Sequence, residues 1–174
     1  MRTATFALTA ALFAAPACAF DLASDEVAEG KTMGIAQVYK GFGCDGGNQA
    51  PALRWSHAPA GTRSFAVTVY DPDAPTGSGW WHWQVYDLPA STAGLPRGGA
   101  LPEGAKQGRN DFGGRDFGGA CPPPGDKPHH YIFTVYALKV DKLAVPDDAS
   151  AALVGYMLRA NSLGSAKLTA RYGR

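Results

Sequence analysis

The chain has 174 residues, of which 45% are hydrophobic and 18% are charged, so it is long enough to bury the core of one ordinary domain. Its 16 basic and 15 acidic residues give a formal net charge of +1, and the basic residues are scattered along the sequence. Because nucleic-acid binding and attraction to anionic membranes usually need a positive stripe or cluster, neither function is expected.

The first 19 residues have the features of a secretory signal peptide. A positive charge precedes the mostly apolar residues 6–13, and Ala17-Cys18-Ala19 fits the small-x-small cleavage pattern. The apolar run is too short to span a bilayer, which needs about 20 residues. Lipidation at Cys18 and a buried N-terminal helix are the alternatives. We expect a cleaved signal peptide over residues 1–19, a single domain over residues 20–174 with no transmembrane segment, and a periplasmic or secreted protein.

Two cysteines remain if Cys18 leaves with the signal peptide, namely Cys44 and Cys121. In an oxidising compartment such a pair is a candidate disulfide. Cys44 lies in the glycine-rich segment 41–47, so the bond would tie this loop to the proline turn beside Cys121, with a typical benefit of about 2–4 kcal/mol. The alternative is two buried free thiols.

Glycine and proline punctuate the rest of the chain. The 22 glycines and 13 prolines fall between short apolar runs. This spacing is typical of short strands joined by tight turns, as in a β-sandwich or barrel. Residues 64–70 alternate, which predicts a strand with Phe65, Val67 and Val69 on one face.

Three later segments are also predicted to be strands. In residues 81–86, alternation predicts one face with Trp81, Trp83 and Val85 and an opposite face with His82, Gln84 and Tyr86. Residues 131–138 are almost continuously apolar and rich in β-formers, which predicts a central strand buried on both faces. Residues 165–172 alternate again and predict a half-exposed strand.

One helix is predicted between the last two strands. Asp147-Asp148 would cap its N-terminus and suit the positive end of its dipole. Positions i, i+3, i+4 and i+7 predict an apolar face made of Leu153, Tyr156, Met157 and Ala160. Residues 161–164, with Asn and Gly at their ends, would stop it. Residues 89–128 show little periodicity, and a long irregular segment in a compact domain is usually functional.

Two proline-rich turns each precede a histidine that opens an apolar strand. The first turn is Asp71–Pro75, followed by Trp80-Trp81-His82-Trp83, and the second is Cys121–Gly125, followed by His129-His130-Tyr131. Proline fixes φ and carries no N–H, so such turns are rigid. Two of them in one small domain predict a single preformed polar pocket.

The residue types in these segments suit an anionic ligand. The N–H groups of His82 and His129 and the hydroxyl of Tyr131 can donate to phosphoryl oxygens, more strongly if the imidazole is charged. Asp71 or Asp73 could hold a histidine in one tautomer and keep it protonated, or accept the ammonium group of a zwitterion. Prolines and tryptophans would supply apolar walls.

Structural explanations compete with several of these roles. Asp73 would otherwise only stabilise a turn through its own backbone. The tryptophans of residues 80–83 are more often core than ligand platform. His130 is equally compatible with the pocket and with packing. No ligand spacing demands a metal, and no cofactor is expected.

At these motifs the chain resembles the phosphatidylethanolamine-binding protein family, also called the Raf kinase inhibitor protein family, and within it the bacterial YbhB/YbcL-like branch. The matching stretches are residues 41–44, 48–55, 67–89, 107–113, 118–138 and 168–174. The resemblance implies a mainly β fold, an antiparallel β-sandwich with one or two short helices. It also implies a small anion pocket formed by Asp71, Asp73, Pro75, His82, Pro122, Pro123, His129 and Tyr131. The family usually has arginine where this chain has His130.

Three functions remain open from the sequence. The first is a non-catalytic binding protein for a small anionic ligand or a phospholipid head group. The second is a protein-interaction module that inhibits a protease or kinase, as some relatives do. The third is a hydrolase, which is disfavoured because the chain has neither a Gly-x-Ser-x-Gly elbow nor a His-Glu-x-x-His motif. Bacterial relatives are often dimers, so a homodimer is a further expectation.

Overall fold

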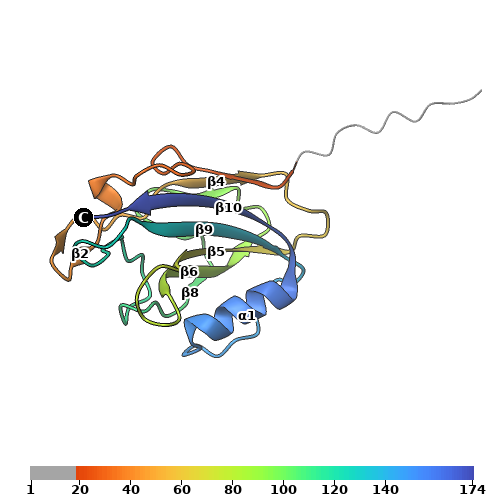
Figure 1. Ribbon diagram of the computed structural model, residues 1–174. Coiled ribbons are helices and arrows are strands. Elements are labelled where there is room, and N and C mark those ends of the chain that lie inside the picture. Colours follow the sequence, from red (N-terminus) through yellow and green to blue (C-terminus); the bar gives the residue numbers. More distant parts are fainter. Residues whose placement is uncertain (1–18) are drawn as a thin grey trace, which may run out of the picture.

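The computed structural model describes residues 19–174 (Figure 1). The predicted signal peptide therefore lies outside the described residues, apart from its last position, and so does Cys18. Within residues 19–174, no helix has the length and apolar character that crossing a bilayer requires.

The described chain is built mainly from antiparallel strands, as predicted. The large sheet has the order β10-β9-β5-β6-β8, with bounds Ser162–Tyr172, His129–Leu138, Ser64–Asp71, Trp80–Pro89 and Lys106–Gln107. The small sheet has the order β1-β4-β7, with bounds Asp21–Ala23, Leu53–Ser56 and Gly94–Leu95. A two-residue pair joins β2 (Lys40–Gly41) to β3 (Cys44–Asp45), and the helices are η1 (Ile35–Gln37) and α1 (Ala151–Asn161).

The main core lies between the two sheets. From the large sheet, Phe65, Val67 and Val69 of β5 point into it together, which confirms the alternation predicted for this strand. Leu53 and Trp55 of β4 face them from the small sheet. Each such side chain contributes about 1.5–3 kcal/mol when fully buried, so this interface holds the sandwich together.

The strand predicted over residues 131–138 is β9, which begins two residues earlier at His129. It pairs with β10 on one side and β5 on the other, and its apolar residues, except the half-buried Ile132, are buried on both faces. In β10, Ala166, Leu168 and Ala170 are buried while Lys167 is exposed, so the predicted half-exposed strand is confirmed.

In β6 the predicted alternation is wrong for two residues, Trp81 and His82. Val69 pairs with Trp83 but Tyr70 pairs with Trp81, so His82 is an extra residue opposite β5, a β-bulge. The bulge turns Trp81 toward α1, where it packs against Tyr70 with ring centroids 4.6 Å apart and the ring planes tilted by 42°. It also turns His82 to the face that carries Trp83. Alternation alone could not reveal this, because a bulge breaks the two-residue period.

The predicted helix is present, but its cap and its buried face are wrong. Ser150, rather than Asp147 or Asp148, caps α1 by accepting a hydrogen bond from the backbone N–H of Leu153. The helix covers the second face of the large sheet (Figure 1) with Ala151, Val154, Gly155 and Leu158, whereas Tyr156 is 68% exposed. Both stripes have helical spacing, but only this one has a glycine. A Cβ at Gly155 would lie 3.1 Å from the Trp81 ring, so the glycine lets helix and sheet approach.

Candidate functional site

One end of the large sheet carries a cavity of about 160 Å³. Because β5 runs antiparallel to both β6 and β9, the end of β5 at Asp71 lies beside the starts of β6 at Trp80 and of β9 at His129. The turns that follow or precede these strand ends complete the wall. The cavity is lined by Phe42, Asp71, Ala74, Pro75, Thr76, Trp80, His82, Phe112, Cys121, Pro122, Pro123, His129 and Tyr131.

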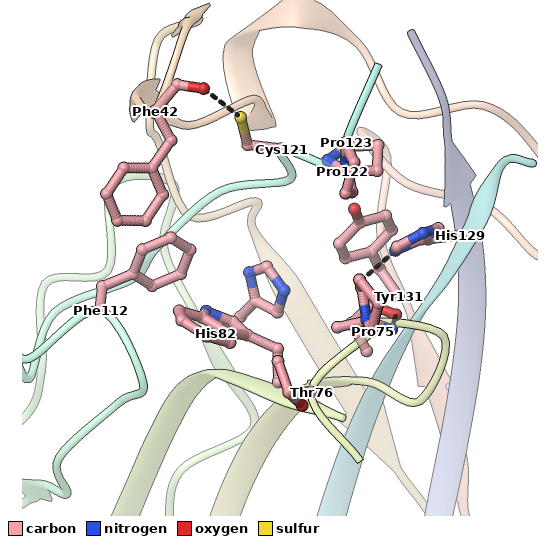
Figure 2. Close-up of a pocket in the computed structure, with 13 residues that line it drawn as sticks. Phe42, Pro75, Thr76, His82, Phe112, Cys121, Pro122, Pro123, His129 and Tyr131 are labelled. Atoms are coloured by element: carbon pink, nitrogen blue, oxygen red, sulfur yellow. Dashed lines mark hydrogen bonds and ion pairs between the residues drawn. The ribbon is translucent and has the colours of Figure 1, made fainter. Parts of the chain in front are cut away.

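The two proline corners therefore meet around one cavity. Seven of the eight residues expected in the pocket line it, namely Asp71, Pro75, His82, Pro122, Pro123, His129 and Tyr131. Figure 2 shows His82 between Phe112 and Tyr131, and the Tyr131 hydroxyl pointing toward Pro122 and Pro123. The rings of His82 and Tyr131 meet edge-on, with centroids 5.1 Å apart.

Asp71 organises the first corner and one histidine at once. Its Oδ1 accepts hydrogen bonds from the backbone N–H groups of Asp73 and Ala74, at 2.8 and 3.2 Å. Its Oδ2 lies 2.7 Å from Nδ1 of His129, and the two side chains are 4% and 5% exposed. Both carboxylate oxygens are thus engaged within the protein. The pair fixes the His129 ring and directs its Nε2 toward Asp126, whose Oδ2 is 3.5 Å away.

Asp73 and His130 form a second pair outside the cavity. Oδ2 of Asp73 lies 2.7 Å from both the backbone nitrogen and Nδ1 of His130, and both side chains are 40% exposed. Neither residue lines the cavity. His130 points to the opposite face of β9 from His129 and Tyr131, as the two-residue period of a strand requires.

His82 is held by the segment that follows β8. Its Nδ1 donates to the carbonyl oxygen of Gly118 at 2.8 Å, and its own carbonyl accepts from the Gly118 N–H. Gly118 must lack a side chain here, because a Cβ would lie 2.4 Å from the Phe112 ring. Burial lowers the pKa of His82 from its ordinary value and outweighs its Gly118 hydrogen bond and the attraction of Asp71, which raise it. The imidazole is therefore neutral near pH 7.

Three buried polar atoms around the cavity have no hydrogen-bond partner. In the described part of the chain five buried side-chain polar atoms lack one, and three of these belong to cavity residues: Trp80 Nε1, His82 Nε2 and Tyr131 Oη. Leaving such an atom unpaired costs about 1–3 kcal/mol. Burial raises the pKa of Tyr131 above its ordinary value, and the carboxylates of Asp71 and Asp73 raise it further, so its hydroxyl stays protonated. Trp80 and Tyr131 can thus donate, and His82 Nε2 can bind a further group.

The arrangement suits hydrogen bonding to a small polar group. Among residues 19–174, no group of three or more His, Cys, Asp or Glu side chains is arranged to hold a metal ion. The wall around the three polar atoms is mostly proline and aromatic. A few fixed polar atoms in an apolar recess are typical of sites that orient a ligand.

An aromatic wall closes the other side of the cavity, and the motifs did not predict it. Phe42 and Phe112 stack with ring centroids 5.9 Å apart, and Phe112 stacks on Tyr39 at 4.2 Å. Phe42 is 68% exposed and has a φ of 52°, within the left-handed region. The sequence did contain one indication of this wall, which is a large aromatic residue between two glycines in a loop. An exposed aromatic that does not pack in the core often marks a binding surface.

A disulfide bond and the side chain of Arg174 hold the loop of Phe42 against the second proline corner. Cys44 and Cys121 form the predicted disulfide, with Cα atoms 6.0 Å apart. Arg174 joins the same two segments without covalent bonds. Its guanidinium donates to the carbonyl oxygens of Pro122 at 2.7 Å, Gly43 at 2.9 Å and Phe42 at 3.3 Å.

The chain is similar to known proteins in both sequence and structure. The protein YbcL of Escherichia coli strain K12 is 57% identical over 166 residues, which cover 92% of this chain and 91% of YbcL. The crystal structure of E. coli YbcL, described as a new member of the mammalian PEBP family, matches with a TM-score of 0.86 and 56% identity, over 89% of this chain and 98% of that chain.

Two further relatives extend the match. YbhB of E. coli K12 is 48% identical over 87% of this chain and 98% of its own length. LppC of Mycobacterium tuberculosis strain H37Rv, named as a lipoprotein, is 37% identical over 75% of this chain and 63% of its own length. A family model described as phosphatidylethanolamine-binding protein matches residues 23–173. The chain therefore belongs to the phosphatidylethanolamine-binding protein family.

Proposed function

We propose that the protein is a non-catalytic binding protein whose cavity takes a small anion or phosphate ester, such as a phospholipid head group. Membership of the family supports the role of a binding protein, because its members bind ligands of this kind. The proposed ligand-binding residues are Trp80 and six of the seven predicted residues that line the cavity. The seventh, Asp71, belongs to the site because it orients His129.

The observation that carries the proposal is the set of three unpartnered atoms. Trp80 Nε1, His82 Nε2 and Tyr131 Oη come from the starts of two strands that are far apart in sequence. The oxygens of such a ligand would accept from Trp80 Nε1 and Tyr131 Oη, and a hydroxyl group on the ligand would give His82 Nε2 a partner. Binding would thus remove the cost of burying these atoms unpaired. A phosphoryl group brings such oxygens in a compact shape that fits a cavity of about 160 Å³.

The carboxylates near the cavity serve the protein rather than the ligand. Oδ1 of Asp71 already accepts from two backbone N–H groups and Oδ2 faces His129, so Asp71 has little remaining capacity to accept an ammonium group. Asp73 does not line the cavity. Asp71 instead orients the ring of His129. Nε2 of that ring faces the carboxylate of Asp126, which is 42% exposed.

We also propose that the protein acts outside the cytoplasm. The relative LppC is named as a lipoprotein, which is compatible with an exported protein. The disulfide between Cys44 and Cys121 agrees with this, because disulfides persist in oxidising compartments. Intact-mass measurement of the exported protein tests the expected cleavage after residue 19.

Calorimetric titration with inorganic phosphate and with O-phosphoethanolamine tests the binding function. We expect saturable binding at about pH 5.5 that weakens at least tenfold in Tyr131→Phe, because that variant removes only one hydroxyl donor. His57→Ala is the matched control, since His57 is exposed and lies outside the cavity. Absence of binding to the native protein, or equal binding by Tyr131→Phe, would refute the proposal.

A further inference from the structure

The tautomer of His82 determines which kind of atom it offers to a ligand. The Gly118 carbonyl oxygen can only accept, so the His82 nitrogen 2.8 Å from it, Nδ1, carries the proton. In a neutral imidazole the other nitrogen is then an acceptor. Nε2 is buried and has no partner, and the residue as a whole is 3% exposed. The cavity therefore contains an unfilled acceptor as well as two donors.

The groups around His82 keep this arrangement. Asp71 of β5 and Asp111 of the segment after β8 both favour a charged imidazole, but burial opposes them and prevails. Asp71 is already paired with His129 of β9, which reduces what it can do for a second histidine. Tyr131 of β9 presents a protonated hydroxyl and adds no charge. A ligand consequently meets a neutral His82.

We propose that the cavity selects oxyanions that carry their own proton, such as the monoanion of phosphate or of a phosphomonoester. One unprotonated oxygen of the ligand accepts from Trp80 Nε1 and another from Tyr131 Oη, while the P–OH group donates to His82 Nε2. No bond is made or broken. This inference rests on the proposed binding function and narrows the ligand of the same cavity to phosphate or a phosphomonoester. A free head group such as O-phosphoethanolamine meets this condition, whereas the phosphodiester of an intact phospholipid does not.

The proposal distinguishes anions of similar size and shape. Sulfate and phosphodiesters have no O–H near neutral pH, so one of their oxygens would face the lone pair of His82 Nε2. They bind only if His82 first takes up a proton against the effect of its burial. A phosphomonoester, with its second pKa near about 6, brings the proton itself.

Calorimetry with four anions tests this selectivity on the native protein. The anions are inorganic phosphate, methyl phosphate, dimethyl phosphate and sulfate, at about pH 5.5, where a phosphomonoester is mostly the monoanion. We expect the first two to bind roughly tenfold to hundredfold more tightly than the last two. Repeating the titrations in buffers of different ionisation enthalpy should show uptake of about one proton with sulfate and almost none with methyl phosphate.

A His82 variant and NMR of His82 test the same inference independently of the calorimetry on the native protein. In His82→Gln the amide can donate or accept, so phosphate and sulfate should bind within about threefold of each other. Nitrogen NMR of the free native protein should show a protonated Nδ1 and an unprotonated Nε2 at His82. A protonated Nε2, or equal binding of sulfate without proton uptake, would overturn the inference and leave the proposed function intact. Failure of all four anions to bind would overturn both.

Discussion

Two histidine–aspartate pairs at the start of β9 have the same atoms at the same distance but opposite surroundings. In both, Nδ1 of the histidine lies 2.7 Å from Oδ2 of the aspartate. His129 and Asp71 are 5% and 4% exposed and line the cavity, whereas His130 and Asp73 are both 40% exposed and lie outside it. The two histidines are neighbours in sequence, so the period of the strand alone assigns them to different faces.

Because the contact geometry is the same, this contrast predicts that burial decides what such a pair contributes to stability. Removing one partner of a buried pair leaves an uncompensated polar group and typically costs about 3–5 kcal/mol. An exposed pair is screened by water and is worth about 0–1 kcal/mol. Asp71 is also engaged at Oδ1 by two backbone N–H groups, so its removal affects the turn as well as the histidine.

The largest expected effect is the loss of stability on replacing Asp71, the aspartate of the buried pair. Asp71→Ala leaves the backbone N–H groups of Asp73 and Ala74 and the Nδ1 of His129 without their acceptor. We expect it to lower the free energy of unfolding by about 3–5 kcal/mol. Asp73→Ala, the matched control, should cost less than about 1 kcal/mol.

Urea denaturation at neutral pH measures both variants. Equal losses of stability in the two variants would contradict this prediction, because the two pairs would then differ in burial but not in energy. If Asp71→Ala is too unstable to purify, Asp71→Asn keeps an acceptor for the turn and replaces only the oxygen that faces His129 with an amide NH2 group.

The second prediction concerns the loop of Phe42. This loop borders the cavity that Asp71 and His129 line and that Asp73 and His130 do not. The disulfide between Cys44 and Cys121 ties the loop of Phe42 to the second proline corner, and Cys121 lines the cavity. Replacing both cysteines by serine should cost about 2–4 kcal/mol, since the bond closes a long loop in the unfolded chain.

NMR of the two histidines shows where that loss is felt. In the double serine variant the ring signals of His129 should shift, while those of His130 should not, because only His129 lies in the cavity. Equal shifts at both histidines would mean that the disulfide acts on the whole fold rather than on the cavity.

Most of the fold followed from sequence pattern because its strands obey simple periods. Alternation identified β5 and β10, and a continuous apolar run identified β9. Two features broke those periods. The bulge at His82 changed the face of Trp81, and a glycine in α1 selected one apolar stripe over another. Both depend on packing between elements, which no single segment encodes.

The candidate site was predictable only where local motifs form it. The two proline corners and their histidines could be recognised along the chain, and the fold brings them together. The aromatic wall of Phe42 and Phe112 and the hydrogen bonds of Arg174 could not be anticipated, because their partners are distant in sequence. The acceptor role of His82 also needed the structure, since it depends on the Gly118 carbonyl.

A third, smaller loss of stability is expected on replacing Arg174, whose hydrogen bonds also hold the loop of Phe42. Arg174→Met keeps much of the aliphatic stem but removes the three hydrogen bonds to main-chain carbonyls. Because the guanidinium is exposed, we expect a loss of about 1 kcal/mol. The disulfide and Arg174 hold the same segments, so combining their removal should weaken phosphate binding by more than the product of the separate effects. A double-mutant cycle that is strictly additive would contradict this coupling.

The smallest expected effect is the pH dependence of the stability that the exposed pair, Asp73 and His130, provides. Partial burial would raise the pKa of Asp73, but the hydrogen bonds from the backbone N–H and ring of His130 outweigh it and hold that pKa below its ordinary value. The charged carboxylate therefore stabilises the fold at neutral pH, and this contribution is lost as pH falls below about 4, through the folded pKa. Asp73→Asn should cost less than about 1 kcal/mol at pH 7, and the difference should vanish at low pH, because the native aspartate is then also neutral. Urea denaturation across this pH range measures it, and a difference that persists in acid would show that Asp73 acts through its turn and not through its charge.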